Sequence, residues 1–207
     1  MNPTFRDAMN FPSKTKEKKS KPLSICVCGM AGSGKSTVAK KIAQKYGLNY
    51  FSGGDALMTL ALEEGYRPLE RGWWESKEGM HFLEKRGKDP RFDRTVDKKL
   101  LEMAQRGGAV LDSWTMPWLL KRGYKIWLEA SVEDRAKRIA GRDKITLEEA
   151  LEALKQKEKQ TKNIYQKMYG FSLGEDFAPF NFILDTETLS AEEVFQILCL
   201  VMENVVL

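Results

Sequence analysis

The sequence contains only one histidine and three cysteines among 207 residues, which is too few cysteines for a disulfide framework. Cys26 and Cys28 alternate within a short apolar segment, and Cys199 lies far from them along the chain. The first two could be zinc ligands, but buried and reduced thiols of a cytoplasmic protein fit the pattern better. His81 has no second ligand near it in the sequence, so we expect it to have a structural role.

Long apolar runs are also missing. No stretch of about twenty apolar residues occurs, so we expect no segment to cross a membrane. The C-terminal run 194–207 contains Gln196, Glu203 and Asn204, which favours a helix packed on a core. The first residues lack the apolar centre of a signal peptide. We therefore expect a cytoplasmic protein.

Excess positive charge is scarce outside the N-terminus. The chain has a formal net charge of +5, and residues 1–21 contribute +4 of it through six basic and two acidic side chains. Residues 1–22 show no helical or strand periodicity and predict a disordered basic tail. The nearly neutral remainder argues against nucleic-acid binding, so we expect at most a weak RNA or ribosome contact through this tail.

The rest of the chain alternates short apolar runs with helical patterns, which is typical of parallel sheets covered by helices. We expect strands at 23–28, 48–51, 109–112, 124–130 and 182–185. We expect helices at 35–46, 54–64, 75–86, 91–106 and 146–169, and after Ser131 and Ser190. Thr146 with Glu149, and Ser190 with Glu193, form capping boxes. The pattern predicts one α/β domain at 23–207 with a five-stranded parallel sheet.

A glycine-rich loop follows the first strand directly. Its sequence, G-M-A-G-S-G-K-S-T at 29–37, matches G-x-x-x-x-G-K-[S/T] and leads into a helix. The glycines let backbone N–H groups converge on phosphate oxygens, towards which the helix directs its positive end. Lys35 can bridge the β- and γ-phosphates, and Ser36 is a natural Mg²⁺ ligand. The loop predicts a P-loop NTPase fold that binds Mg-ATP through Gly29, Ala31, Gly32, Ser33, Gly34, Lys35, Ser36 and Thr37.

Asp112 ends the third predicted strand, at the edge where open α/β sheets place groups that contact ligands. Its carboxylate can hold a magnesium-bound water, which makes it a second metal candidate beside Ser36. The alternative is that Asp112 caps the segment that begins near Ser113. Both roles could hold together, and we favour the metal role.

The remaining motifs concern the acceptor of the phosphoryl group. No N-K-x-D motif follows a strand, which argues against a GTPase. The motif S-G-G-D lies at 52–55, D-P-R-F-D-R-T-V-D at 89–97, I-W-L at 126–128, Y-Q-K-M-Y-G at 165–170 and L-D-T at 184–186. In this order and spacing, the motifs resemble those of nucleoside monophosphate kinases, most closely the archaeal-type cytidylate kinases. The resemblance covers nearly all of the chain after the basic tail.

This resemblance implies a core domain, an acceptor-binding segment at about 53–106 and a short LID at about 135–165. It also implies transfer of the γ-phosphoryl group of ATP to a nucleotide phosphate. Gly54 and Asp55, in the S-G-G-D turn, are then candidates for contact with the acceptor.

Two arginines match the pair at the start of the LID in adenylate kinase-like enzymes. Arg138 and Arg142 are one turn apart on one helix face, so both can reach the transferring group and stabilise its charge. The alternative is a solvated basic face shared with Arg135 and Lys137.

Two acidic residues could identify the acceptor base. Asp93 and Asp97 are one turn apart and could accept hydrogen bonds from an exocyclic amine such as that of cytosine. Arg94, between them, could contact the base or its phosphate. The alternative is a surface helix whose acidic first turn suits the helix dipole, and the sequence favours neither reading.

The departures from the family pattern concern the acceptor site. Met58 stands where an arginine is common, and Ser113 and Trp114 replace a glycine and an arginine after the third strand. Lys157 and Ile164 likewise replace arginines of the LID. The lost charge could be supplied by Arg67, Arg71, Arg91 and Arg94. The same region holds Trp73, Trp74, Trp114 and Trp118, of which we expect Trp114 to face the acceptor and at least two others to pack internally.

Three hypotheses follow from these features. The first is an ATP- and Mg²⁺-dependent kinase of CMP or dCMP, acting as a monomer on a small nucleotide. The second is a P-loop kinase of a different small acceptor, which Met58 and the altered residues around Trp114 favour. The third is a nucleotide-regulated RNA- or ribosome-associated ATPase that binds through the basic tail.

Overall fold

A computed structural model of the chain describes residues 23–68 and 72–206. The disordered tail expected at residues 1–22 and the candidate cation Arg71 therefore lie outside the described residues.

The centre of the fold is a five-stranded sheet whose strands are all parallel and lie in the order β2-β3-β1-β4-β5. The inner strands β1 and β3 are buried along their whole length, because helices cover both faces of the sheet. The five predicted strands are confirmed, with ends that shift by one or two residues. Their bounds are β1 Ile25–Cys28, β2 Asn49–Ser52, β3 Ala109–Asp112, β4 Tyr124–Glu129 and β5 Phe182–Asp185.

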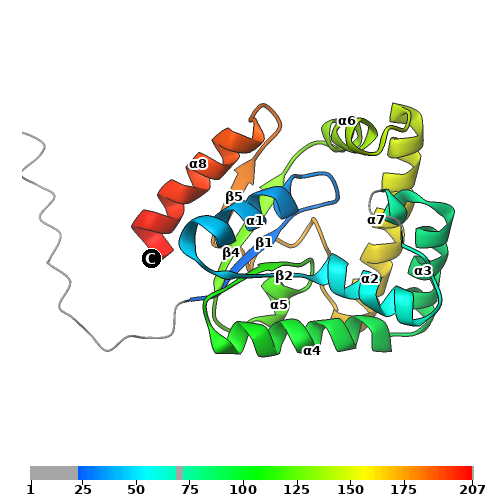
Figure 1. The fold of residues 1–207 in the computed structure, drawn as a ribbon, viewed down its shortest axis with the longest axis horizontal. Helices are drawn as coiled ribbons and strands as arrows, with labels where there is room; N and C mark the ends of the chain where they lie inside the picture. Colours follow the sequence, from blue (N-terminus) through cyan, green and yellow to red (C-terminus); the bar gives the residue numbers. More distant parts are fainter. Residues whose placement is uncertain (1–22, 69–71, 207) are drawn as a thin grey trace, which may run out of the picture.

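Helices connect the strands and surround the sheet (Figure 1). The capping boxes of α7 and α8 are both present, as predicted. The helices are α1 Lys35–Tyr46, α2 Gly53–Glu63, α3 Lys77–Lys88, α4 Arg91–Arg106, α5 Met116–Leu119, α6 Val132–Asp143, α7 Leu147–Tyr169 and α8 Ala191–Val201. A 3₁₀ turn, η1 (Trp73–Glu75), precedes α3, and a π-helical turn, η2 (Met202–Val206), follows α8. The helix α5 and the turn η1 were not predicted, because they are too short to show periodicity.

The two faces of the sheet pack against different helices. Ile25 and Val27 point into a core that α1 and α8 complete. Cys26 points the other way, into a core shared with α2, α3 and α4. Alternate residues of one buried strand therefore hold both layers together. All three cysteines are buried and free, as expected.

The parallel strands bring several loops to one edge of the sheet. The glycine-rich loop follows β1, the turn to α2 follows β2, and Asp112 ends β3 beside Ser52. Figure 1 shows α2, α3, α6 and α7 gathered at the same end of the molecule. This edge is where the predicted site residues meet. Within residues 23–68 and 72–206, no helix has both the length and the hydropathy to cross a bilayer.

Candidate active site

The glycine-rich loop has backbone angles that are strained for residues other than glycine. Gly32 has a φ of 83°, and a Cβ there would lie 2.7 Å from the carbonyl oxygen of Arg135. Gly34 has a φ of 87° and caps α1, so the loop turns directly into the helix N-terminus at Lys35. The loop is thus pressed against α6 while its end presents the positive pole of α1 to any bound anion.

A first cavity, of about 460 Å³, lies between this loop, α6 and the start of α8, and we call it the α6–α8 cavity. Its walls include the loop from Gly32 through Thr37, the two candidate arginines, and Thr186 after β5. Gly29 and Ala31 are not among its lining residues, although Ala31 lines the neighbouring cavity. A cavity that begins at a helix N-terminus and ends in cationic side chains suits a polyphosphate.

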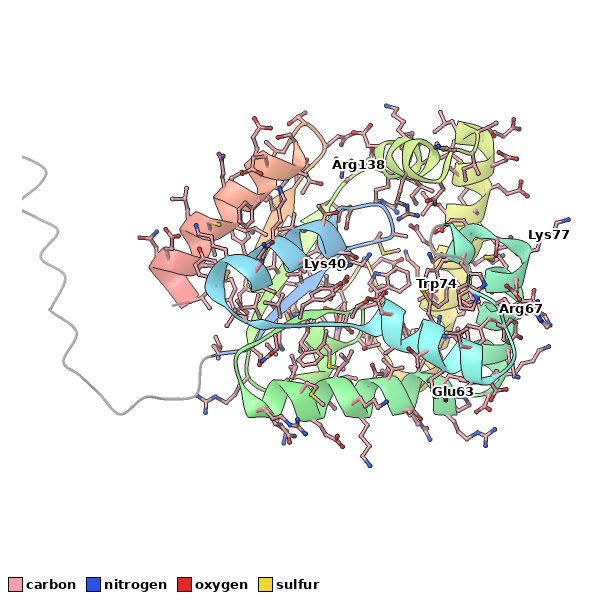
Figure 2. All side chains as sticks on the ribbon, in the orientation of Figure 1. Lys40, Glu63, Arg67, Trp74, Lys77 and Arg138 are labelled. Atoms are coloured by element: carbon pink, nitrogen blue, oxygen red, sulfur yellow. The ribbon has the colours of Figure 1, made fainter. Side chains whose placement is uncertain are left out.

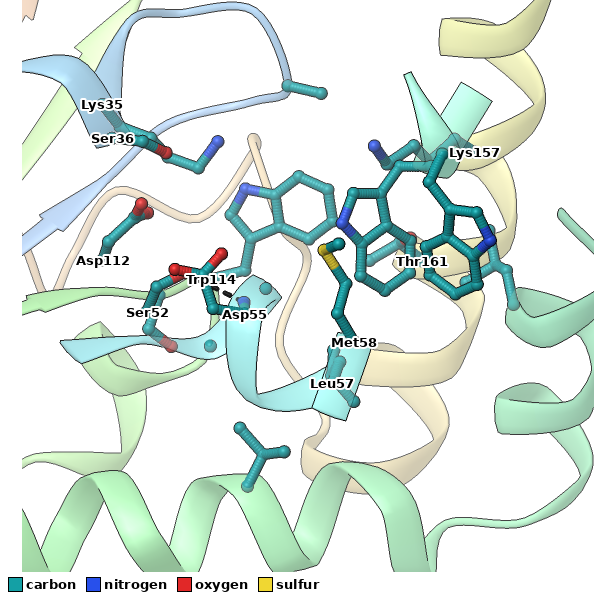
Figure 3. Close-up of a pocket in the computed structure, with 18 of the residues that line it drawn as sticks. Lys35, Ser36, Ser52, Asp55, Leu57, Met58, Asp112, Trp114, Lys157 and Thr161 are labelled. Carbon is teal, nitrogen blue, oxygen red and sulfur yellow. Dashed lines mark hydrogen bonds between the residues drawn. The ribbon is translucent and has the colours of Figure 1, made fainter. Parts of the chain in front are cut away.

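A second cavity, of about 360 Å³, opens on the other side of Lys35 and is called the α2–α7 cavity. It is lined by η1, α2, α4 and α7, and it shares Lys35, Ser36 and Arg142 with the first cavity. Figure 3 shows Lys35, Ser36 and Asp112 at one side of this cavity and Lys157 and Thr161 at the other. The arrangement can hold two ligands whose reacting ends meet at Lys35.

Asp112 provides a carboxylate at this junction. It is 4% exposed and accepts a hydrogen bond from the Tyr50 hydroxyl at 3.0 Å, and it makes no ion pair within the described parts of the chain. Together with the Ser36 hydroxyl it offers hard oxygen donors, which suit Mg²⁺. The alternative role as a helix cap is not what the structure shows, because Ser113 Oγ accepts the N–H groups of Thr115 and Met116.

The candidate arginines share one face of α6, as predicted, but they differ in surroundings. Arg138 donates to the hydroxyl and carbonyl oxygens of Thr186, at 3.1 and 2.6 Å, and lines only the α6–α8 cavity. Arg142 lines both cavities, donates to Asp143 and lies 3.5 Å from Glu75. Arg142 is therefore the arginine placed between the two cavities.

The neighbouring arginine of α6 does not form a solvated basic face with them. Arg135 is buried, donates to the carbonyl oxygens of Ala130 and Ala31, and pairs with Glu158 of α7. It thus joins α6, α7 and the glycine-rich loop. Only Lys137, which is exposed and pairs with Asp134, fits the solvated reading.

Asp93 and Asp97 both line the α2–α7 cavity, and both are buried. Asp93 is bound by the guanidinium of Arg86 through two hydrogen bonds, and Asp97 accepts the hydroxyls of Thr115 and Tyr169. The surface-helix alternative is therefore wrong for these two carboxylates. Arg94 is exposed and lines neither cavity, so the structure does not bring it to the predicted place.

The buried Asp97 makes stability depend on pH. Burial raises its pKa to about 6 from an ordinary 3.8, although the two hydroxyl donors act in the opposite direction. Because the folded chain holds this proton more tightly than the unfolded chain, the free energy of unfolding falls as pH rises from about 4 to about 6. At about pH 8 we expect the Asp97→Asn variant to have a free energy of unfolding up to about 3 kcal/mol above that of the parent. Its unfolding temperature should therefore be higher than that of the parent. This gain in stability should vanish near about pH 3.5, which thermal unfolding at the two pH values measures. An equal gain at both pH values would contradict a raised pKa of Asp97.

The tryptophans divide between packing and the site. Trp114 donates its indole N–H to the carbonyl oxygen of Gly29 at 2.6 Å, and its ring centroid lies 5.4 Å from Lys35 Nζ. It therefore supports the glycine-rich loop while lining the α2–α7 cavity. Trp73 is buried, and Trp118 stacks on Phe171 with ring centroids 3.9 Å apart, as expected of internal packing residues.

The turn after β2 closes the near wall of the same cavity. Gly54 and Asp55 line it, and the Asp55 N–H donates to Ser52 Oγ at 3.1 Å, which starts α2. Met58 also lines the wall, so the position where an arginine is common presents a thioether instead.

Among the described residues, the cations of the α2–α7 cavity do not include Arg67, Arg91 or Arg94, which were predicted as replacements. Arg67 lies at the outer edge of the molecule (Figure 2), and Arg91 is 87% exposed and pairs with Asp89. The cavity instead contains Arg86 from α3, Lys157 from α7 and Lys40 from α1. Arg86 could have been predicted, because only seven residues separate it from its partner Asp93 in the sequence. Lys157 could not, because its partner Glu75 lies 82 residues away along the chain.

Comparisons with known proteins agree with this arrangement. Residues 24–188 match the cytidylate kinase-like family. The chain is 34% identical over 176 residues to a cytidylate kinase of Pyrococcus horikoshii, which covers 84% of this chain and 85% of that protein. It is 35% identical over 174 residues to a cytidylate kinase of Ignicoccus hospitalis, covering 83% and 94%.

Solved structures share the fold. A shikimate kinase from Acinetobacter baumannii superposes with a TM-score of 0.53 at 20% identity, covering 90% of this chain and 96% of that one. A deoxyadenosine kinase from M. mycoides gives a TM-score of 0.52 at 17% identity, covering 88% and 100%. The fold is therefore that of P-loop kinases.

Proposed function

Because this chain belongs to the cytidylate kinase-like family, we propose that it transfers the γ-phosphoryl group of Mg-ATP to CMP or dCMP. The chain is a nucleoside monophosphate kinase-like phosphotransferase. The observation that carries the proposal is the junction of the two cavities at Lys35, Ser36 and Arg142. The α6–α8 cavity would take ATP, and the α2–α7 cavity would take the monophosphate.

The residues at the junction have the chemistry that phosphoryl transfer needs, which is positioning and stabilisation of charge. Lys35 would neutralise the β- and γ-phosphates cradled by the glycine-rich loop. Ser36 and Asp112 would hold Mg²⁺, which neutralises phosphate charge when it is bound. Arg142 would stabilise the group in transfer, whereas Arg138 would hold the donor nucleotide from its place beside Thr186.

We propose that the part of the α2–α7 cavity lined by α2 and α4 receives the acceptor nucleoside. Trp74 and Trp114 supply flat apolar surface there, and Gly54 and Asp55 form the adjoining wall. Each carboxylate oxygen of Asp97 accepts one hydroxyl and has a second lone pair, so it can accept an exocyclic amine as well. The named cytidylate kinases among the relatives support a cytosine base.

The segments 53–106 and 135–165 are proposed to be the acceptor-binding segment and the LID of this enzyme. The first segment supplies α2 to α4, and the second supplies most of α6 and α7. We also propose that the enzyme acts as a monomer. Three buried free thiols support a reducing, cytoplasmic environment.

The proposal is tested by measuring ATP-dependent ADP release with the full chain across a panel of ribo- and deoxyribonucleoside monophosphates. We expect CMP or dCMP to give the highest kcat/KM, with AMP, GMP and UMP lower. Stimulation by none of the monophosphates would remove the proposal. Omission of Mg²⁺ should abolish the stimulated rate.

One observation favours a second candidate, a P-loop kinase of a different small acceptor. The cations deep in the α2–α7 cavity are paired with carboxylates: Arg86 with Asp93, and Lys157 with Glu75. A dianionic acceptor must compete with these internal partners, whereas an uncharged hydroxyl compound need not. This candidate predicts tight ATP binding with no turnover of any nucleoside monophosphate, followed by turnover of a non-phosphorylated alcohol in a metabolite screen.

A further inference from the structure

A buried carboxylate occupies the middle of the cationic wall of the α2–α7 cavity. The side chain of Glu75, at the end of η1, is 6% exposed. It accepts from Lys157 Nζ at 2.9 Å and lies 3.5 Å from a terminal nitrogen of Arg142. Glu75 therefore joins the acceptor-binding segment to α6 and α7, and it touches the arginine that lies between the two cavities.

Lys157, Arg142 and Lys35 place three positive charges close together around Glu75. Burial lowers the pKa of Lys157, and the charges of Lys35 and Arg142 lower it further, so all three cations lie within electrostatic reach of one another. Glu75 is the acid that opposes this effect on Lys157. Asp143 would still neutralise Arg142 if Glu75 were absent, but Lys157 would lose its ion-pair partner. Repulsion among the cations would then favour the binding of an external anion.

A second observation on α7 points to a ligand at the same place. Thr161 lies one turn after Lys157, lines the α2–α7 cavity and is 0% exposed. Its hydroxyl has no hydrogen-bond partner among the residues that the structure describes. Buried hydroxyls without partners are rare in folded proteins, and a ligand that brings an acceptor atom would satisfy this one. Figure 3 shows Lys157 and Thr161 at the same wall of the cavity.

We propose that Lys157, Arg142 and Thr161 form an anion subsite for the phosphate of the acceptor, and that Glu75 occupies this subsite until the phosphate displaces it. The inference rests on the proposed function, because it assigns the acceptor phosphate to these groups. It also accounts for the departure at Met58 and Trp114, since the positive charge comes from α6 and α7 instead. Displacement removes the 3.5 Å contact between Arg142 and Glu75, while Asp143 continues to hold the guanidinium through two hydrogen bonds.

The turn that carries Glu75 is anchored independently of the ion pair. Trp73 donates its indole N–H to Glu78 at 2.9 Å, and Ser76 caps α3. The Glu75 side chain can therefore leave the subsite by rotation while η1 stays in place. An exchange of one carboxylate for one phosphate also keeps the buried cations compensated throughout.

The test measures binding of inorganic phosphate to the full chain by titration calorimetry, with ADP present to occupy the glycine-rich loop. We expect Glu75→Gln to bind phosphate at least about tenfold more tightly than the parent, the factor expected when one charge-assisted competitor is removed. Glu75→Asp keeps the charge but shortens the side chain, so it should show a smaller gain and should fold if Glu75→Gln does not. Adding Lys157→Gln should abolish the gain.

Glu78→Gln is the matched control, because it removes a carboxylate from the same segment that binds Trp73 outside the cavity. It should leave phosphate affinity unchanged. Unchanged or weaker phosphate binding in both Glu75 variants would overturn the inference, as would an equal gain in Glu78→Gln. The calorimetry uses no nucleoside monophosphate, so its outcome is independent of the turnover assay. Phosphate binding could contradict this inference while CMP turnover supports the proposed function, or the other way round.

Discussion

Lys35→Ala is expected to lower kcat/KM for phosphoryl transfer by about a thousandfold or more. Lys35 lies at the start of α1, lines both cavities and makes no ion pair within residues 23–68 and 72–206. Its ammonium group is therefore not neutralised by a described carboxylate and is available to the β- and γ-phosphates. Loss of this cation removes charge compensation where the transferred group carries its charge.

The variant should keep its fold, because alanine is a strong helix former and the Lys35 side chain forms no ion pair among the described residues. Thermal unfolding within a few degrees of the parent would establish this. Lys41→Ala is the control, since Lys41 lies on the same helix and pairs with Glu192 at the surface. Retention of a tenth or more of the parent activity by Lys35→Ala would contradict the assigned role.

Arg142→Ala is expected to lower kcat by about a hundredfold to a thousandfold while it changes the dissociation constant of ATP only slightly. The reason is its place between the cavities, where it can reach the group in transfer. Arg138 lines only the α6–α8 cavity, so Arg138→Ala should weaken ATP binding more than it lowers kcat. The two arginines of one helix face should thus separate in their kinetic effects.

Single-turnover rates and ATP titrations of both variants measure this difference. Lys137→Ala, on the exposed side of α6, should change neither quantity. If Arg142→Ala weakened ATP binding as much as it slowed turnover, a role in the transition state would be contradicted.

The fold and the donor half of the site were predictable from the sequence because their signals are local. Strand and helix periodicity, two capping boxes and the glycine-rich loop each depend on neighbouring residues. The order of these motifs also predicted the family, which the comparisons confirm. The position of Asp112 was predictable for the same reason, since it ends a strand at the sheet edge, and its metal role stays a prediction.

The acceptor half was predicted less well because its contacts join distant segments. Arg67, Arg91 and Arg94 lie in the expected segment, but all three are exposed to solvent. Arg86 and Lys157 reach the cavity because α3 and α7 pack together, and no local pattern reports that packing. Glu75 belongs to a three-residue turn that has no periodicity of its own.

The destination of the γ-phosphoryl group tests the central claim most directly. The full chain would be incubated with Mg²⁺, γ-³²P-labelled ATP and CMP or dCMP, and the labelled products would be separated. We expect the label to appear in CDP or dCDP, and we expect Lys35→Ala to form these products about a thousandfold or more slowly. Label found only in inorganic phosphate, with CMP and dCMP unchanged, would contradict the account and would indicate an ATPase instead.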